Sequence, residues 1–306
     1  MLWVPVLTLA AALCVTALPT RRSVTALSSS QISAWTSPAY FASAAYCPDY
    51  TISAWSCGSA CNGNAKPTSV VTGGDGGSTP RFYIATLSDN SLVVAISGTN
   101  TSNDASIAVD LEFPLTSVST SDFPGASGVE VHTGFLDAFE RLKGTVTSAV
   151  QSGVSGGATN VLVTGHSLGG ALVHLTATYL QKLLGTGVTV TAKAFASPRV
   201  GNQAWADYVD ATLGSNAQHM INFNDDVPHV PPRDWGFQQS SGEVWILQGG
   251  TTYESCSGQE NAQCSDSLES GLDEAALVAS FVTDMDSSEH RGPYAGVNIT
   301  SVTCTA

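Results

Sequence analysis

One serine stands where an apolar run gives way to a glycine-rich segment. Ser167 lies in Gly165-His166-Ser167-Leu168-Gly169, after the apolar residues 161–164 and before residues 169–184, whose apolar residues recur at helical spacing. The pattern G-x-S-x-G between a strand and a helix is typical of a tight turn that exposes a nucleophilic hydroxyl. The flanking glycines fit because such a turn leaves no room for a Cβ atom. The alternative interpretation is a glycine-rich helix start with Ser167 as its N-cap.

A serine hydroxyl is a weak nucleophile, so it needs a base, and the base needs a carboxylate that orients it. Asp225 and Asp226 follow the end of an expected strand, where such a carboxylate belongs. The alternative for this pair is a turn in which an aspartate side chain caps the backbone before Pro228. The chain order serine, acid, histidine leaves two candidates for the base, His229 and His290.

The other four histidines are less suitable as the base. Two of them, His132 and His166, lie beside motif glycines. His174 is seven residues after Ser167 on the same expected helix, and His219 lies within a strand. The backbone N–H of Leu168, at the start of the helix, is expected to face a developing oxyanion. These residues together predict acyl transfer through a serine nucleophile.

Strands and helices alternate around this turn and must position it. Residues 81–87 and 91–97 predict a β-hairpin, and further strands are expected at 160–165, 188–197, 218–224 and 243–249. Helices are expected at 135–153, at 169–185 and late in the chain at 273–285. This alternation predicts an α/β domain with a mixed sheet.

Composition and charge exclude several classes of function. The net charge is −14 with only 11 basic residues, which argues against binding to nucleic acid or docking on an anionic membrane. The glycine-rich stretch Thr72–Pro80 lacks the lysine of a phosphate loop and is interpreted as a surface turn. No cysteine or histidine spacing favours zinc, and we expect no metal or organic cofactor.

The N-terminus has the pattern of an exported protein. Residues 1–17 predict a signal peptide, and residues 18–22, which end in Arg21-Arg22, a candidate pro-segment. The alternative is an N-terminal membrane anchor, although the apolar run is at the lower edge of spanning length. No later segment is apolar enough to span a bilayer, and residues 23–306 are expected to form one domain.

Six cysteines follow the signal segment, and an even number in an exported chain predicts disulfides. Proximity in the sequence favours Cys57–Cys61 and Cys256–Cys264, which leaves Cys47–Cys304.

The chain resembles the fungal class 3 lipase family, which includes triacylglycerol lipases and feruloyl esterases of filamentous fungi. Six motifs in order carry this resemblance across residues 40–304: Ile96–Asn100, Val131–Glu140, Val163–Leu172, Phe195–Asn202, Asn224–Pro232 and His290–Tyr294. The resemblance implies an α/β-hydrolase fold, with a central, mostly parallel mixed sheet flanked by helices and a short lid over the site.

The resemblance also selects among the open candidates. It implies Asp225, not the adjacent Asp226, as the acid, and His290, not His229, as the base. It implies that Thr99 joins Leu168 in the oxyanion hole. One departure is Ser97, which stands where most members of the family have arginine. The lid of the family corresponds to Thr99–Phe113, whose only apolar run here is residues 107–109.

We therefore expect a secreted, monomeric serine carboxylester hydrolase with the catalytic residues Ser167, Asp225 and His290. The leading substrates are acylglycerols, met at a lipid–water interface. The polar lid keeps a second hypothesis open, a feruloyl or other short-chain or aryl esterase acting on plant-wall esters. A third, more remote, is an inactive relative that binds lipid or glycan. Asn100 and Asn298 lie in glycosylation sequons.

Overall fold

The structure, a computed structural model, describes residues 22–99, 114–269, 287–300 and 304. The signal segment, the candidate pro-segment up to Arg21, the lid segment from Asn100, and the expected late helix 273–285 lie outside these residues. Within the described ranges, no helix is both long enough and apolar enough to cross a membrane.

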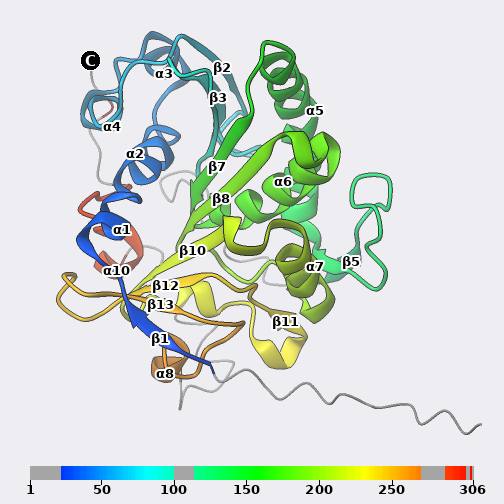
Figure 1. Cartoon of the computed structure of the whole chain (residues 1–306), viewed down its shortest axis with the longest axis vertical. Helices are drawn as coiled ribbons and strands as arrows, with labels where there is room; N and C mark the ends of the chain where they lie inside the picture. The colour runs from blue at the N-terminus through cyan, green and yellow to red at the C-terminus, as the bar shows by residue number, and fades with distance from the viewer. Residues whose placement is uncertain (1–21, 100–113, 270–286, 301–303, 305–306) are drawn as a thin grey trace, which may run out of the picture.

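A nine-stranded sheet forms the centre of the molecule (Figure 1). Its strand order is β1-β13-β12-β10-β8-β7-β4-β3-β2. The five central strands, from β12 to β4, run parallel, and both edges are antiparallel. The strands of this sheet are β1 (Val24–Ala26), β2 (Ser69–Gly73), β3 (Phe82–Thr86), β4 (Leu92–Ile96), β7 (Asn160–His166), β8 (Thr189–Phe195), β10 (Ala217–Asn222), β12 (Glu243–Ile246) and β13 (Tyr253–Cys256).

A small antiparallel sheet in the order β11-β9-β6-β5 lies beside the central one. It comprises β5 (Leu115–Ser117), β6 (Glu130–His132), β9 (Gly201–Asn202) and β11 (Phe237–Gln238). The helices are α1 (Ser29–Ser33), α2 (Thr36–Ala44), α3 (Asp49–Ala54), α4 (Gly58–Asn62), α5 (Thr133–Ser155), α6 (Leu168–Leu184), α7 (Gln203–Leu213), α8 (Asp266–Glu269) and α10 (Ser288–Arg291).

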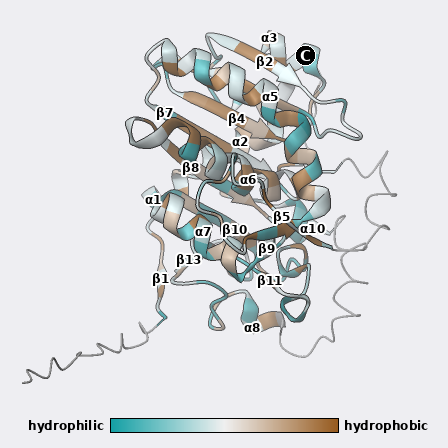
Figure 2. Cartoon of the chain, turned by 90° about the vertical axis from the view of Figure 1, so that its right-hand side faces the viewer, coloured by the Kyte–Doolittle hydropathy of each residue, from teal (hydrophilic) through white to brown (hydrophobic). Residues whose placement is uncertain are grey.

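Strand β4 shows why the sheet is covered on both faces. Its residues are all buried, and they alternate between two apolar clusters. Leu92, Val94 and Ile96 pack into the cluster formed with α5, α6 and α7, whereas Val93 and Ala95 pack with α2, α3 and α4. Figure 1 shows these two groups of helices on opposite sides of the sheet, and in Figure 2 the strands between them are predominantly hydrophobic. The continuous apolar run of β4 is therefore that of a parallel strand buried on both faces.

The expected elements that fall within the described residues are present, with small differences at their ends. The hairpin is β3 and β4, the helix expected at 135–153 is α5, and the strand before Ser167 extends to His166. The sequence predicts a turn throughout Thr72–Pro80, but Thr72 and Gly73 belong to β2 and pair with Tyr83 and Phe82. The turn itself therefore begins at Gly74.

The three expected disulfides are present: Cys47–Cys304, Cys57–Cys61 and Cys256–Cys264. The first joins residues 257 positions apart and ties the last described residue to the loop after α2. A cross-link over so long a loop strongly restricts the unfolded chain.

Two histidines are buried side by side between α6 and β10. His174 and His219 are each 1% exposed, and their ring centroids lie 6.0 Å apart. Among the described residues, no hydrogen-bond partner is found for either ring nitrogen of His174 or for Nδ1 of His219. Burial lowers the pKa of His174 to about 4, and burial with the neighbouring rings lowers that of His219 to about 3. Both rings are therefore neutral in the folded protein at neutral pH.

These lowered pKa values predict a loss of stability in mild acid. The unfolded rings bind protons below about pH 6.5, whereas the folded rings do so only near pH 4 and 3. The free energy of unfolding should therefore fall as the pH drops from 6.5, by about 2 kcal/mol per ring between pH 7 and pH 5. Urea unfolding at both pH values, compared between the parent and a His174→Phe variant, measures this loss.

The variant should lose less stability than the parent over the same interval. Glu243 changes stability in the opposite direction, because burial raises its pKa to about 7. Its contribution to the free energy of unfolding therefore decreases as the pH rises from 4.5 to 7. A Glu243→Gln variant removes that opposing slope. An identical pH dependence in the parent and in His174→Phe would contradict the assignment to this pair.

Candidate active site

Ser167 has a strained backbone at the turn between β7 and α6. Its φ of 60° and ψ of −128° lie in a region that residues with side chains rarely adopt. Although Ser167 is at the N-cap position, its side chain makes no capping hydrogen bond. The serine thus occupies the N-cap position without capping the helix through its side chain, and its hydroxyl faces another partner.

The glycines around Ser167 are required by close backbone contacts. A Cβ at Gly165 would lie 2.7 Å from the carbonyl oxygens of Gly169 and Ile96, and one at Gly169 only 2.3 Å from that of Ile96. A Cβ at Gly170 would lie 2.9 Å from the side chain of Ser197. The end of β7, the start of α6 and the end of β4 thus meet at a separation that only glycine permits.

The structure brings Ser167, His290 and Asp225 into one hydrogen-bonded series. Oγ of Ser167 lies 3.0 Å from Nε2 of His290. On the other side of the ring, Nδ1 lies 3.0 and 3.1 Å from the two carboxylate oxygens of Asp225. All three side chains are buried. This arrangement allows Nε2 to accept the hydroxyl proton while Nδ1–H donates to the carboxylate.

Asp225 has a second role in its own loop. Its Oδ1 accepts a hydrogen bond of 3.0 Å from the backbone N–H of Val227, which begins a short 3-10 helix, η3 (Val227–His229). The aspartate turn before Pro228 is therefore present, and the same carboxylate also faces His290. The two interpretations of this residue, a turn former and a partner of histidine, are both correct.

Neighbouring polar groups hold the backbone of His290. The carbonyl of His290 accepts a hydrogen bond of 2.7 Å from Nε2 of His166 and one of 3.0 Å from the hydroxyl of Tyr294. Since Nε2 of His166 donates, its Nδ1 accepts from the hydroxyl of Tyr46, at 2.7 Å. Burial and the adjacent His290 keep the pKa of His166 well below its usual value, so this ring is neutral.

Tyr46 is a residue of the site that the sequence does not reveal, because its contact with His166 spans 120 positions. The motif position of His166 is visible in the sequence, but its partners cannot be read from its neighbours.

Of the two expected oxyanion residues, Leu168 directly follows Ser167 in the chain, and Thr99 directly follows Gly98, which contacts Ser167. Leu168 is the first residue of α6, so its backbone N–H belongs to the unpaired first turn of that helix. Gly98 lies close against Ser167, since a Cβ at Gly98 would be 2.9 Å from that of the serine. Thr99 is the next residue and is partly exposed. Ser97, at the position where the related family carries arginine, is buried, and its N–H donates to the carbonyl of Arg81.

The remaining candidates lie elsewhere. His229 is buried with its Nδ1 3.6 Å from a carboxylate oxygen of Asp266, and His219 and His174 face each other. Among the described residues, one grouping, Glu243 with Cys256 and Cys264, has its potential ligand atoms at metal-binding distances. Its two cysteines form a disulfide, so they offer no thiolate to a metal.

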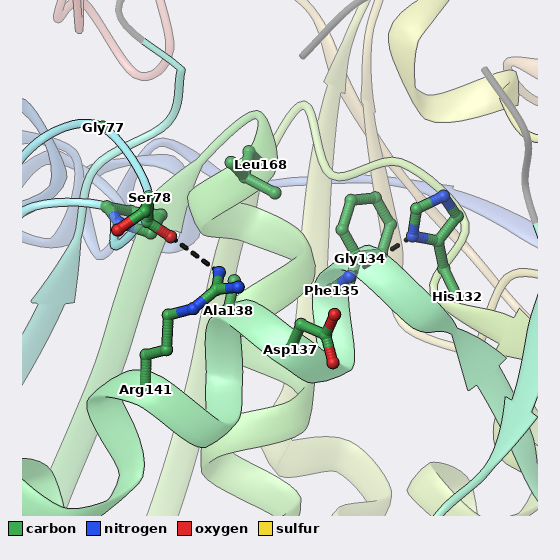
Figure 3. A pocket seen from close by; sticks show the side chains of 10 residues that line it. Gly77, Ser78, His132, Gly134, Phe135, Asp137, Ala138, Arg141 and Leu168 are labelled. Atoms are coloured by element: carbon green, nitrogen blue, oxygen red, sulfur yellow. Dashed lines mark hydrogen bonds between the residues drawn. The ribbon is translucent and has the colours of Figure 1, made fainter. Parts of the chain in front are cut away.

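A pocket of about 470 Å³ opens beside Leu168 (Figure 3). The side chain of Leu168 extends toward it from α6, Phe135 and Ala138 line it from α5, and Ser78 faces them from the turn after β2. At its edge, the guanidinium of Arg141 donates to the carbonyl of Ser78 at 2.8 Å. The turn that the sequence assigned to the surface is therefore one wall of a pocket next to the serine.

Asp75 holds that turn in place. Its carboxylate accepts hydrogen bonds from the backbone N–H groups of Thr79 and Gly77 and from the hydroxyl of Ser78. These bonds lower the pKa of Asp75 to about 2. The wall of the pocket is thus stabilised by a carboxylate that stays ionised across the neutral range.

A model of the family described as "Lipase (class 3)" matches residues 93–235, a range that includes Ser167 and Asp225. Over this range the chain is similar to the class 3 lipases. The secreted mono- and diacylglycerol lipase MDL5 of Malassezia globosa is 31% identical over 198 residues. That alignment covers 64% of this chain and 63% of the relative, so it spans less than two thirds of the relative's length.

Solved lipase structures are similar over most of the chain. Lipase II from Rhizopus niveus is 26% identical, with a TM-score of 0.71, over 90% of this chain and 98% of that one. A triacylglycerol lipase described as having a serine protease triad as its catalytic centre is 27% identical, with a TM-score of 0.72 and the same coverage. The fold is accordingly that of the α/β-hydrolases, as the sequence resemblance implied.

The glycine contacts at the turn between β7 and α6 predict that a Gly→Ala substitution has opposite effects on stability at two sites. Gly169→Ala would force a Cβ against the Ile96 carbonyl, and we expect it to lower the free energy of unfolding by about 3 kcal/mol. Gly144, in the interior of α5, has open space around the position that a Cβ would take, with no neighbouring atom of the described residues within 4 Å. Gly144→Ala is the matched control and should raise stability by about 1 kcal/mol.

Chemical denaturation of both variants measures these effects. Equal stability of Gly169→Ala and the parent would contradict the close contact between Gly169 and the Ile96 carbonyl.

Proposed function

We propose that this chain is a secreted serine carboxylester hydrolase that cleaves acylglycerol esters. The observation that carries the proposal is the series from Ser167 Oγ through the His290 ring to the Asp225 carboxylate, with contacts of 3.0 to 3.1 Å. The strained turn at Ser167 supports it, because that backbone keeps the hydroxyl out of the helix cap and free to react.

The proposed reaction proceeds in two halves. Ser167 attacks the ester carbonyl while His290 takes its proton, and the backbone N–H groups of Leu168 and Thr99 stabilise the oxyanion. His290 then gives the proton to the leaving alcohol, which leaves an acyl-serine. A water molecule, deprotonated by His290, attacks the acyl-serine, and the acid is released as His290 returns that proton to the Ser167 oxygen. Asp225 stabilises the imidazolium in both halves.

The nature of the relatives and of the pocket supports the substrate class. The relative from Malassezia is named a mono- and diacylglycerol lipase, and the solved neighbours are lipases. The pocket beside Leu168 is lined by the apolar Pro80, Phe135 and Ala138 and by the polar His132, Asp137 and Arg141. The apolar part of this lining fits the hydrocarbon part of an ester. We therefore prefer acylglycerols to the aryl esters that the polar lid segment left open.

The proposal includes export of the chain as a monomer that meets its substrate at a lipid–water interface. The relative's name includes the word secreted, and the three disulfides fit an oxidising compartment. The first described strand, β1, begins at Val24, directly after the candidate processing site at Arg21-Arg22. Asn298, in one of the two sequons, is exposed and thus open to a glycan.

Loss of the proposed nucleophile should abolish both turnover and covalent labelling. We expect Ser167→Ala to lower kcat on 4-nitrophenyl butyrate by about 10⁵-fold and to prevent labelling by a fluorophosphonate, with the melting temperature preserved. Ser152→Ala, on the exposed face of α5, is the control and should behave as the parent. A parent protein that is folded but not labelled would instead support the inactive, ligand-binding relative.

The substrate class predicts a preference that kinetics can measure. Initial rates on monoacylglycerol, diacylglycerol, tributyrin and methyl ferulate should rank the acylglycerols above the ferulate by at least about tenfold in kcat/KM, a difference of about 1.4 kcal/mol. Measuring the rate of tributyrin hydrolysis across its solubility limit tests whether the enzyme acts at a lipid–water interface. If it does, the rate should jump when droplets form. Ferulate cleaved as fast as the acylglycerols would overturn the substrate assignment in favour of the aryl esterase.

A further inference from the structure

A buried ion pair lies behind the loop that carries Asp225. Arg199, just after β8, has no exposed surface, and the side chain of Glu260, in the loop after β13, is 3% exposed. Nε of the arginine donates to Oε1 of Glu260 at 2.8 Å, and Nη2 donates to Oε2 at 3.0 Å. Of the lysines and arginines in the described ranges, Arg199 is the one that is buried. Burial alone would raise the pKa of Glu260, but the charge and hydrogen bonds of Arg199 lower it to about 2.

Arg199 also donates hydrogen bonds to the loop that follows β10 and carries Asp225, residues 223–231, which we call the acid loop. Nη1 donates to the carbonyl of His229 and, at 3.2 Å, to that of Pro231. The backbone N–H of Arg199 donates to the carbonyl between them, that of Val230, at 2.8 Å. One residue therefore binds three successive carbonyls that begin four positions after Asp225.

The start of the same loop is fixed independently. The N–H of Asp225 donates to the carbonyl of Asn222, the last residue of β10, at 3.0 Å. The side-chain amide of Asn222 in turn donates to the carbonyl of Glu289, which precedes His290. The acid loop is thus anchored to the sheet at its beginning and to Arg199 at its end, with the Asp225 carboxylate between the two anchors.

Glu260 is itself held in a defined position. The disulfide Cys256–Cys264 closes the loop that contains it, and its Oε1 accepts a second hydrogen bond from the N–H of Gln239 at 2.7 Å. A guanidinium holds its donors in a fixed plane. Binding of Nε and Nη2 to Glu260 therefore also fixes the direction in which Nη1 donates to the acid loop.

A buried ion pair is weak evidence for stability, because removing both charges from water costs about as much as their attraction returns. We infer that Arg199 and Glu260 are positioning residues for the proposed hydrolysis: they set the end of the acid loop so that the Asp225 carboxylate faces Nδ1 of His290. This inference rests on the proposed function, since Arg199 and Glu260 touch no substrate and act only through Asp225.

The experiment replaces both charges by apolar groups of similar size. Arg199→Met or Glu260→Leu alone would leave one buried charge unpaired and is expected to unfold the protein readily. The double variant, Arg199→Met with Glu260→Leu, removes both charges and should retain a cooperative fold. We expect its kcat on 4-nitrophenyl butyrate to fall by about ten- to a hundredfold with KM changed less than about twofold.

The pH dependence of kcat/KM distinguishes a misplaced Asp225 carboxylate from a general loss of rigidity in the protein. A carboxylate that no longer faces His290 stabilises the imidazolium less, so the acid limb of kcat/KM should move to lower pH. The control is Lys143→Met with Asp122→Leu, which removes an ion pair of 2.9 Å between α5 and the segment that joins β5 to β6. Its kcat and acid limb should equal those of the parent.

A readout that does not need turnover distinguishes this inference from the proposed function. The proton shared between His290 Nδ1 and Asp225 should give a downfield ¹H NMR signal in the parent and lose or shift it in the double variant. If the parent is inactive, the proposed function fails, but the signal still tests the positioning. If the double variant does not fold, Arg199→Lys, which keeps a positive charge opposite Glu260 but removes the second set of donors, is measured in its place. Unchanged kcat, acid limb and signal in the folded variant would overturn the inference.

Discussion

The structure of this site depends on one contact between backbones. Where β7 ends and α6 begins, the chain passes so close to the end of β4 that neither Gly165 nor Gly169 could carry a side chain. This contact fixes the unusual backbone of Ser167, directs its hydroxyl away from the helix, and places Gly98 beside it. The parallel order of β4, β7, β8 and β10 then determines the rest, because Ser167 and Asp225 both follow the carboxyl ends of strands in one sheet.

The second requirement is that polar side chains from four separate segments of the chain fix the backbone around His290. His166 and Tyr294 bind the carbonyl of His290, Asn222 links the acid loop to the residue before it, and Arg199 binds the far end of that loop. Most of these donors bind carbonyl groups and not the reacting atoms. The site is therefore an arrangement of main-chain segments, in which buried polar side chains satisfy backbone groups that neither helix nor sheet can pair.

Much of the fold could be predicted from sequence because its strongest signals are local. The apolar run of β4, the helical spacing in α5 and the G-x-S-x-G turn each occupy a short stretch of chain, at most the 23 residues of α5, and each lies where the patterns indicate. The site residues that lie in local motifs could be identified from the sequence. The choice between the adjacent Asp225 and Asp226, however, required the family resemblance. Tyr46, Glu260 and the pocket wall at Ser78 carried no signal, since their contacts with His166, Arg199 and Arg141 each span at least 61 positions. Contacts of that range depend on the strand order, which no local pattern encodes.

The disulfide between Cys47 and Cys304 makes the chain between them a covalent ring. Ser167, Asp225 and His290 all lie within that ring, so a single cut in any surface loop between the two cysteines opens the ring but releases no fragment. The strand order and the glycine contact at the turn between β7 and α6 remain available to hold the cut ends in place. In a medium that contains proteases, such a molecule can be nicked once and still keep every group of its site on one connected chain.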